Sequence, residues 1–364
     1  MSGRPLRVVI AGGGTGGHLY PGIAVARELQ ARRPGAIVTF AGTARGLEAR
    51  VVPREGFELD VIRSAGLKGT ALAARLRGFA LLPLSALDAW RLLSRRAPDL
   101  VIGVGGYSSG PVVALAAVRG IPTLLLEQNA LPGVTNRLLA PLVRAAAVTY
   151  ESTLPFFRGK GFVAGNPVRP GFFDRPEPAG AAAEDRVRVL IFGGSQGARA
   201  INAACVEAAP ALAASAPPLA ITHQTGERDL AFVREGYARA GLDARVEAFL
   251  YEMEREMHEA DLVVCRAGAT TLAELAAAGK PSILIPLPTA ADDHQRRNAE
   301  VVAAAGAAEV IDQRELTGDA LASRIGALAA DRARREAMGR AARALARPDA
   351  AAAIAGRALA LVGA

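Results

Sequence analysis

The feature that most constrains the fold is a glycine-rich loop that occurs twice, each time between an apolar strand pattern and a helical one. The first loop, residues 12–18, reads Gly-Gly-Gly-Thr-Gly-Gly-His and follows the apolar residues 6–11. The second, residues 193–197, reads Gly-Gly-Ser-Gln-Gly and follows residues 187–192. This order is typical of the first strand and helix of a parallel α/β sheet. The chain is therefore predicted to contain two such domains.

Strand and helix patterns alternate through both halves, which predicts parallel sheets joined by right-handed crossovers. In the first half, further strands are expected near residues 36–41, 59–62, 100–104, 122–126 and 145–149, and helices near residues 21–31, 48–55, 70–95, 109–118 and 134–142. In the second half, further strands are expected near residues 219–223, 245–249, 261–265, 282–286 and 308–311.

The Gly- and Pro-rich stretch at residues 159–171 is typical of a junction. We therefore expect one domain over residues 1–164 and a second over 165–346. A last helix is expected to begin near Pro348, and residues 347–364 are expected to pack back on the first domain. Ligands bind at the carboxyl ends of strands in such folds, so a cleft faced by both sheets is the expected site.

The positive charge of the chain is unevenly distributed. Residues 1–164 contain 20 basic and 9 acidic side chains, whereas residues 165–364 contain 23 and 26. A preference for arginine, which supplies 40 of the 43 basic residues, does not explain this asymmetry. The excess predicts an anionic surface or substrate for the first domain.

Several classes of protein are disfavoured by composition. The two cysteines, Cys205 and Cys265, are too few and too far apart for a disulfide framework or a CxxC metal site. The N-terminus has no signal-peptide pattern. The long uncharged run at residues 100–118 is interrupted by four glycines and a proline, which argues against a membrane span.

The first loop alone leaves its ligand open. Gly12-x-Gly14-x-x-Gly17 also fits a dinucleotide fingerprint, but the second strand ends at Thr43 without the acidic residue that a ribose requires. Arg45 could instead meet a 2′-phosphate. Glycine loops also serve as tight turns without a ligand. Two loops in equivalent positions nevertheless favour two phosphate-bearing ligands, because helix N-termini attract anions.

Two further groups carry candidate chemistry. His18 stands at a helix N-terminus, where a neutral imidazole is favoured and could accept a proton from a hydroxyl; alternatively it only hydrogen-bonds its own loop. Arg266, at the end of a buried strand, could neutralise a diphosphate. Glu274, in the helix that follows, could accept hydrogen bonds from both hydroxyls of a ribose, or be a solvated helix acid.

Residues 76–93 combine apolar side chains, the single tryptophan Trp90, and arginines at both ends. This pattern is typical of a helix that lies in a membrane interface. An ordinary amphipathic helix of the core has the same pattern, so both interpretations remain open.

Seven motifs occur together in one order, and the ordered set is much more specific than any one of them. They lie at residues 12–22, 105–111, 127–129, 165–169, 193–198, 265–274 and 293–298. With these motifs the chain resembles the MurG family of peptidoglycan N-acetylglucosaminyltransferases, from residue 6 to about residue 300.

The resemblance implies a GT-B fold, in which two Rossmann-like domains face a central cleft. It implies an inverting transfer of N-acetylglucosamine from UDP-N-acetylglucosamine. The acceptor would be the C4 hydroxyl of the muramyl sugar in undecaprenyl-diphosphate-linked muramyl pentapeptide (lipid I), and the products would be lipid II and UDP. The enzyme would serve cell-wall synthesis, and hence cell shape and division.

The resemblance also assigns residues to the site. His18 would be the catalytic base. The first loop would meet the donor sugar and the acceptor diphosphate through Thr15, Gly16 and Gly17. Positions that would bind the donor, including the ribose glutamate Glu274 and the phosphate serine Ser195, are Asn129, Arg169, Ser195, Leu250, Arg266, Ala269, Thr270, Thr271, Leu272, Ala273, Glu274 and Gln295.

Two positions depart from the family pattern: Ala267 replaces a common serine, and His294 replaces a glutamine of some members. No metal or other cofactor is expected, because the chain has no DxD motif between apolar strands. Expected partners are the two substrates, an anionic membrane surface and other cell-wall synthesis or division proteins, but not nucleic acid. The enzyme would lie peripherally on the cytoplasmic face of the bacterial plasma membrane.

Three other functions remain compatible with these patterns. One is another enzyme acting on a UDP-sugar, such as an epimerase or a glycolipid synthase. The second is a nicotinamide dehydrogenase, and the third is a membrane-docked module that binds a UDP-sugar without turnover.

Overall fold

The computed structural model describes residues 4–14, 16–44, 46–64, 72–174, 186–290 and 293–363, with the side chains of residues 72–80 and 82 left out. The chain divides into two compact units. The first comprises residues 1–168 together with 347–364, and the second comprises residues 169–346.

The first unit contains a seven-stranded parallel sheet with the order β3-β2-β1-β4-β5-β6-β7. Its strands are β1 (Arg7–Gly12), β2 (Ile37–Gly42), β3 (Glu58–Val61), β4 (Leu100–Gly105), β5 (Thr123–Glu127), β6 (Ala145–Val148) and β7 (Gly161–Val163). Its helices are α1 (Gly16–Arg32), α2 (Glu48–Arg54), α3 (Leu72–Arg96), α4 (Ser109–Val118), α5 (Val134–Leu139), the 3-10 helix η1 (Glu151–Phe157) and α13 (Ala350–Leu361).

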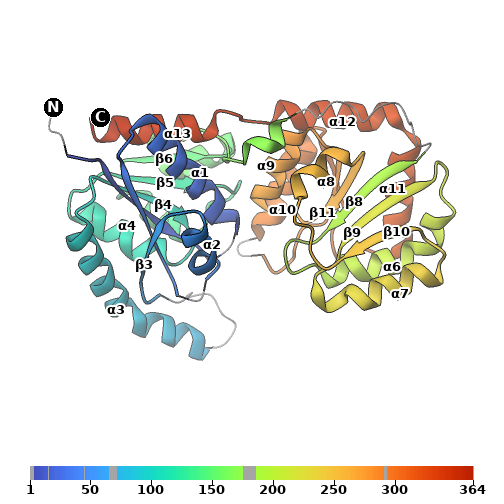
Figure 1. Ribbon diagram of the computed structural model, residues 1–364, viewed down its shortest axis with the longest axis horizontal. Helices are drawn as coiled ribbons and strands as arrows, with labels where there is room; N and C mark the ends of the chain where they lie inside the picture. Colours follow the sequence, from blue (N-terminus) through green and yellow to red (C-terminus); the bar gives the residue numbers. More distant parts are fainter. Residues whose placement is uncertain are drawn as a thin grey trace. The chain divides into compact units, whose positions relative to one another are not determined.

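Alternating residues of the strands feed two apolar layers, one on each face of this sheet. Val8 and Ile10 of β1 pack in the same cluster as residues of α1 and α13, whereas Val9 and Ala11 pack in a cluster with residues of α3, α4 and α5. The C-terminal α13 lies beside α1, as Figure 1 shows, and buries Ile354, Ala355 and Ala358 there.

The second unit contains a six-stranded parallel sheet with the order β10-β9-β8-β11-β12-β13. Its strands are β8 (Val187–Phe192), β9 (Leu219–Gln224), β10 (Ala244–Glu247), β11 (Leu262–Cys265), β12 (Ser282–Leu284) and β13 (Ala308–Val310). Its helices are η2 (Pro170–Phe173), α6 (Arg199–Ala213), η3 (Glu227–Asp229), α7 (Leu230–Arg239), α8 (Met253–Glu259), α9 (Ala269–Ala278), α10 (His294–Ala304), α11 (Gly318–Ala330) and α12 (Arg332–Ala344).

The predicted fold class, two α/β units with parallel sheets, is confirmed. The Gly- and Pro-rich stretch at residues 159–171 contains the boundary between the two units, after Val168. One strand within it was not predicted: Gly161–Val163 forms β7 and pairs with Ala146–Val148 of β6 at the edge of the first sheet. Across the described ranges, no helix is both long enough and apolar enough to cross a bilayer.

Candidate functional site

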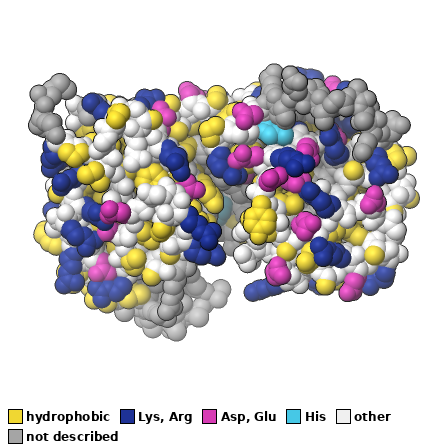
Figure 2. Space-filling view, viewed as in Figure 1, with side chains coloured by type: hydrophobic (Ala, Val, Ile, Leu, Met, Phe, Trp, Pro, Cys, Tyr) yellow, Lys and Arg dark blue, Asp and Glu magenta, His cyan; other side chains and the backbone are white. Residues whose placement is uncertain are grey.

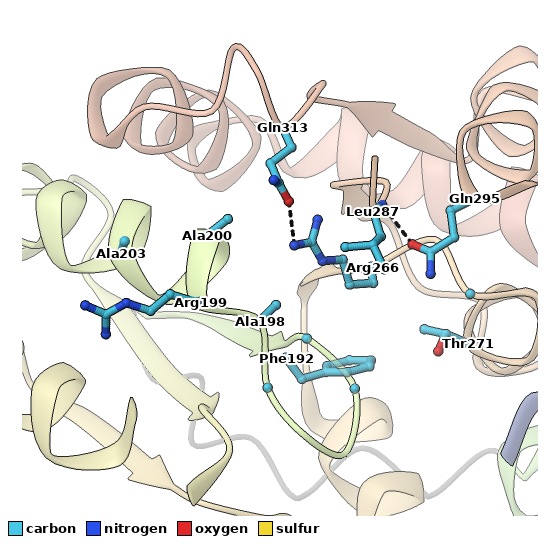
Figure 3. Close-up of a pocket in the computed structure, with 14 residues that line it drawn as sticks. Phe192, Ala198, Arg199, Ala200, Ala203, Arg266, Thr271, Leu287, Gln295 and Gln313 are labelled. Carbon is cyan, nitrogen blue, oxygen red and sulfur yellow. Dashed lines mark hydrogen bonds between the residues drawn. The ribbon is translucent and has the colours of Figure 1, made fainter. Parts of the chain in front are cut away.

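The carboxyl edge of the second sheet carries a cavity of about 650 Å³ (Figure 3). Segments that follow β8, β11, β12 and β13 all contribute to its wall. The lining residues are Phe192, Gly193, Gly194, Gly197, Ala198, Arg199, Ala200, Ala203, Arg266, Gly268, Thr271, Leu287, Gln295 and Gln313.

The second glycine loop forms one wall and leaves no room for side chains at its ends. A Cβ on Gly197 would collide with the carbonyl of Thr225, and one on Gly193 would collide with Ala198. Ser195, at the middle of the loop, is exposed. The loop therefore presents backbone amides and one hydroxyl, groups that suit phosphate oxygens.

Arg266 places a positive charge in the cavity wall. Its guanidinium donates hydrogen bonds to the carbonyls of Ile285 (3.0 Å) and Pro286 (3.2 Å), and to Oε1 of Gln313 (2.7 Å). Figure 3 shows the bond to Gln313 across the cavity wall. Each of these acceptors is neutral, so they orient the guanidinium without cancelling its charge. Burial lowers the pKa of Arg266, but a guanidinium stays protonated at neutral pH.

Gln295 and α9 complete the wall. Oε1 of Gln295 accepts a hydrogen bond from the backbone N–H of Leu287 (3.0 Å), which fixes the side-chain amide beside the cavity. Gly268 precedes α9, and Thr271 in its first turn also lines the cavity. The remaining predicted residues of this turn are half-buried Ala269, Thr270 and Ala273, and buried Leu272.

Glu274 lies one turn further along α9 and is half-buried. Burial is the main cause that raises the pKa of Glu274 to about 7; the charge of Arg169 opposes the increase, and the charge of Glu254 adds to it. Nε of Arg169 lies 3.0 Å from Oε1 of Glu254, and its guanidinium lies 5.2 Å from the ring centroid of Phe172. The charge of Arg169 thus acts on two carboxylates, Glu254 by an ion pair and Glu274 by electrostatic attraction. With a pKa of about 7, Glu274 changes its protonation state near neutral pH.

Sequence reasoning missed Gln224, which links two parts of this region. Gln224 is 2% exposed at the end of β9. Its Nε2 donates to the carbonyl of Gly194 (2.9 Å), and its Oε1 accepts from the N–H of Leu250 (2.8 Å). The side chain therefore ties the glycine loop to Leu250 and occupies the Leu250 amide. A polar residue at the end of a buried strand was the available signal.

The predicted residues of the first unit lie in two segments: the first glycine loop with the start of α1, and the turn after β5. Gly16, Gly17 and His18 form the first turn of α1, while Thr15 lies outside the described residues. The His18 ring packs against the backbone of Gly105, because a Cβ built there would lie 2.7 Å from His18 Cδ2. The imidazole is half-buried beside the two glycine segments that follow β1 and β4.

Asn129 belongs to a hydrogen-bonded turn after β5. Its backbone N–H and its Nδ2 donate to Glu127 Oε1 (3.0 and 3.1 Å), and Nδ2 of Asn136 donates to Glu127 Oε2 (2.8 Å). Burial raises the pKa of Glu127 although these bonds oppose it. Glu127 fixes the turn that carries Asn129, and Asn136 was not predicted.

The structure thus gathers Arg266, Thr271 and Gln295 on one cavity of the second unit. Ser195 belongs to the loop whose glycines line it, and Glu274 is coupled to Arg169. His18, Gly16, Gly17 and Asn129 belong to the first unit. Among the described residues, His, Cys, Asp and Glu side chains form no group of three that could hold a metal ion.

Comparison with known proteins points to one family. Residues 8–148 match the glycosyltransferase family 28 N-terminal domain, and residues 188–354 match the C-terminal domain of that family. The chain is 49% identical over 350 residues to a UDP-N-acetylglucosamine–N-acetylmuramyl-(pentapeptide) pyrophosphoryl-undecaprenol N-acetylglucosamine transferase of Anaeromyxobacter sp. (strain K), covering 95% of this chain and 90% of the relative.

A protein of the same name from Geobacter metallireducens is 47% identical, covering 95% of this chain and 96% of the relative. The crystal structure of Acinetobacter baumannii MurG superposes with a TM-score of 0.81 at 32% identity, covering 98% of this chain and 100% of that one. This chain belongs to the MurG family of glycosyltransferases, with both family 28 domains and the GT-B fold.

Proposed function

We propose that the protein transfers N-acetylglucosamine from UDP-N-acetylglucosamine to the C4 hydroxyl of the muramyl sugar of lipid I, with inversion, and releases lipid II and UDP. The observation that carries this proposal is the cavity of the second unit. A glycine loop offers amides, Arg266 offers a positive charge that donates to three neutral acceptors among the described residues, and Glu274 offers a carboxylate nearby. Together they match the phosphates and the ribose of a nucleoside diphosphate.

The reaction is a single in-line displacement at the anomeric carbon. The acceptor hydroxyl oxygen bonds to this carbon while His18 takes the hydroxyl proton, and the bond between the carbon and the UDP oxygen breaks. Negative charge develops on the leaving diphosphate, where the second glycine loop and Arg266 stabilise it. We propose no metal or other cofactor, because a fixed guanidinium can neutralise this charge.

A thermal-shift experiment separates this function from a nicotinamide enzyme. UDP-N-acetylglucosamine at about a hundred times its Kd is expected to add about 2.7 kcal/mol to the stability of the native state and thus to raise Tm. NADH at the same concentration is expected to leave Tm unchanged. A shift with NADH alone would contradict the assignment.

Transfer of labelled sugar to a lipid I analogue tests the reaction itself. We expect a labelled lipid product that requires both the UDP donor and the acceptor. An epimerase would change the UDP-sugar without an acceptor, and a binding module would raise Tm without product.

We also propose that the first unit docks on a membrane through the α3–α5 surface. We define this surface by exposed apolar side chains that lie on contacting helices or just beyond them. They are Leu84, Leu87 and Trp90 of α3, Val118 of α4, Leu138 of α5 and the nearby Leu142. Figure 2 shows Lys and Arg side chains close to hydrophobic ones over α3 and α4, in the lower left of the view.

The best-described part of this surface is Trp90, which is 52% exposed. The guanidinium of Arg119 lies 4.8 Å from its ring centroid and donates to Ser94 Oγ (3.1 Å). An aromatic ring with a cation beside it suits the level of lipid headgroups. We propose that this surface docks peripherally on the cytoplasmic face of the plasma membrane.

Replacing Leu87 and Trp90 together by glutamate is expected to weaken binding to anionic lipid vesicles at least tenfold. Each change removes roughly 1.5–3 kcal/mol of apolar burial and adds a like charge at the membrane. Vesicle co-sedimentation measures the effect, with transfer to a water-soluble acceptor as the control that should not change. Unaltered sedimentation would exclude this surface.

A further inference from the structure

The first glycine loop already holds an anion, and this anion belongs to the protein. Glu48, the first residue of α2, is 1% exposed. Its Oε2 accepts a hydrogen bond from the N–H of Gly14 (2.8 Å), and its Oε1 accepts from the N–H of Thr43 (2.9 Å) and from Thr43 Oγ1 (2.8 Å). A carboxylate from the segment after β2 is therefore bound to the loop after β1.

The glycines around Glu48 leave room for this carboxylate and for little else. A Cβ on Gly13 would lie 2.5 Å from Glu48 Cδ, and one on Gly42 would lie 2.6 Å from Glu48 Cγ. A Cβ on Gly46 would also collide with the carboxylate. Gly13, Gly42 at the end of β2, and Gly46 thus form a pocket shaped for one side chain, and these glycines serve Glu48 rather than a ligand.

The Glu48 carboxylate is ionised in this pocket. Burial alone would raise its pKa, but hydrogen bonds from the backbone N–H groups of Gly14 and Thr43 and from its own outweigh burial and leave the pKa of Glu48 lowered. The negative charge is therefore permanent at neutral pH. It would repel a second anion placed at the Gly14 amide, which Glu48 already occupies.

The held loop also contacts the segment that supports His18. A Cβ on Gly106 would lie 2.8 Å from the carbonyl oxygen of Gly13, and a Cβ on Gly105 would lie 2.7 Å from His18 Cδ2. The Gly12–Gly14 backbone is thus packed between the Glu48 carboxylate on one side and the Gly105–Gly106 backbone on the other. Displacing the carboxylate would loosen the support of the imidazole.

We propose that Glu48 is a positioning residue for the acceptor half of the reaction: it fixes the first glycine loop from within and occupies the Gly14 amide, so that an acceptor diphosphate meets this loop elsewhere than at Gly14, with His18 held beside the loop. This inference rests on the proposed function. Glu48 itself touches no reacting atom. It makes the loop a preformed site instead of one that each substrate must order, which lowers the entropy cost of binding.

The test is Glu48→Gln, which keeps the shape but leaves one acceptor oxygen for three donors. We expect kcat/KM for a lipid I analogue to fall about tenfold or more, because bonds to a buried charged acceptor are lost. The Kd of UDP-N-acetylglucosamine, whose site is in the second unit, should change less than twofold. Glu55→Gln, which removes a half-buried carboxylate that is paired with Arg27 and lies seven residues away, is the matched control and should match wild type in both measurements.

A second variant changes the wall of the pocket and leaves Glu48 in place. Gly42→Ala places a methyl group against Cγ of Glu48. We expect it, like Glu48→Gln, to lower kcat/KM for the acceptor and to leave the Kd of the donor nearly unchanged. Gly326→Ala adds a methyl group in α11 where no neighbouring atom lies within 4 Å and is its control. Hydrogen exchange over residues 12–18, which needs no activity, should become faster in both Glu48→Gln and Gly42→Ala.

Each outcome has one meaning. If wild type transfers sugar but Glu48→Gln matches it in acceptor kcat/KM, the inference is wrong. If Glu48→Gln loses donor affinity as strongly as acceptor kcat/KM, the inference is also wrong, because that result would indicate a general destabilisation of the protein. If wild type itself transfers no sugar, the proposed function is wrong, and the exchange experiment still decides whether Glu48 fixes the loop.

Discussion

Replacing His18 by alanine is expected to lower kcat by two to four orders of magnitude while the Kd of UDP-N-acetylglucosamine changes less than twofold. General base catalysis by a positioned imidazole typically contributes about 10²–10⁴ to a rate. The cavity proposed for the donor is lined by residues of the second unit, whereas His18 belongs to the first. Rapid-quench measurement of the transfer step, with donor binding by calorimetry, checks both numbers.

A second variant separates a base from a residue that only hydrogen-bonds its own loop. His18→Asn keeps a hydrogen-bonding side chain of similar reach but cannot accept a proton at neutral pH. If His18 is the base, both variants lose turnover to a similar extent. Recovery of more than half of the wild-type kcat in His18→Asn would assign His18 to loop structure instead.

The sequence predicted those features of the fold that depend on local pattern. Apolar strands and glycine loops repeat along the chain, and each can be recognised from a stretch of about ten residues. The β7 strand was missed because Gly161–Val163 is short and lies between glycines and prolines. Its identity as a strand comes from pairing with β6, which a local pattern does not contain.

The residues of the candidate site also fall into those that a local pattern indicates and those that it does not. Arg266, Glu274 and Gln295 could be proposed because each follows a buried strand in its own segment, where side chains face a ligand. Glu48 could not be proposed, because its role depends on Gly14, which lies 34 residues away. Gln224 ends a buried strand, but its bond to Leu250, 26 residues away, is not contained in that local pattern. Both are buried polar side chains whose bonds connect loops, and only the folded chain brings those loops together.

The same bonds limit how the site can bind. Gln224 accepts the hydrogen bond of the Leu250 amide, so a base placed beside Leu250 meets its carbonyl oxygen while this bond is made. Gln313 and two carbonyls hold Arg266, so under the proposed function its guanidinium would not need to reorganise to bind a diphosphate. Preorganised charge of this kind stabilises a leaving group without a cost at the moment of reaction.

Donor binding is expected to weaken about tenfold between pH 8 and pH 6, because burial raises the pKa of Glu274 to about 7. Only the ionised carboxylate can accept hydrogen bonds from both ribose hydroxyls. The ionised fraction falls from roughly 90% to roughly 10% over this range, and apparent affinity scales with the competent fraction. Calorimetric titration with UDP-N-acetylglucosamine across this range measures the effect, and His18→Ala should show the same pH profile.

Glu274→Gln tests the cause of that profile. The variant is expected to bind the donor about 10- to 100-fold more weakly at pH 8, as for the loss of a charged hydrogen bond worth about 1.5–3 kcal/mol, and to show no pH dependence. A wild-type profile that is flat between pH 6 and 8 would remove Glu274 from the ribose site.

The same substitution should stabilise the fold above neutrality. A carboxylate whose pKa is raised on folding contributes stability that is present below its unfolded pKa of about 4.5 and is lost as pH rises through about 7. At pH 8 the ionised Glu274 therefore costs up to about 3 kcal/mol, which a neutral glutamine does not. We expect Glu274→Gln to raise Tm at pH 8 and to leave it nearly unchanged at pH 4. A residue that weakens the fold while it strengthens donor binding is retained for binding, so this opposite pair of effects would separate a ribose ligand from a surface acid.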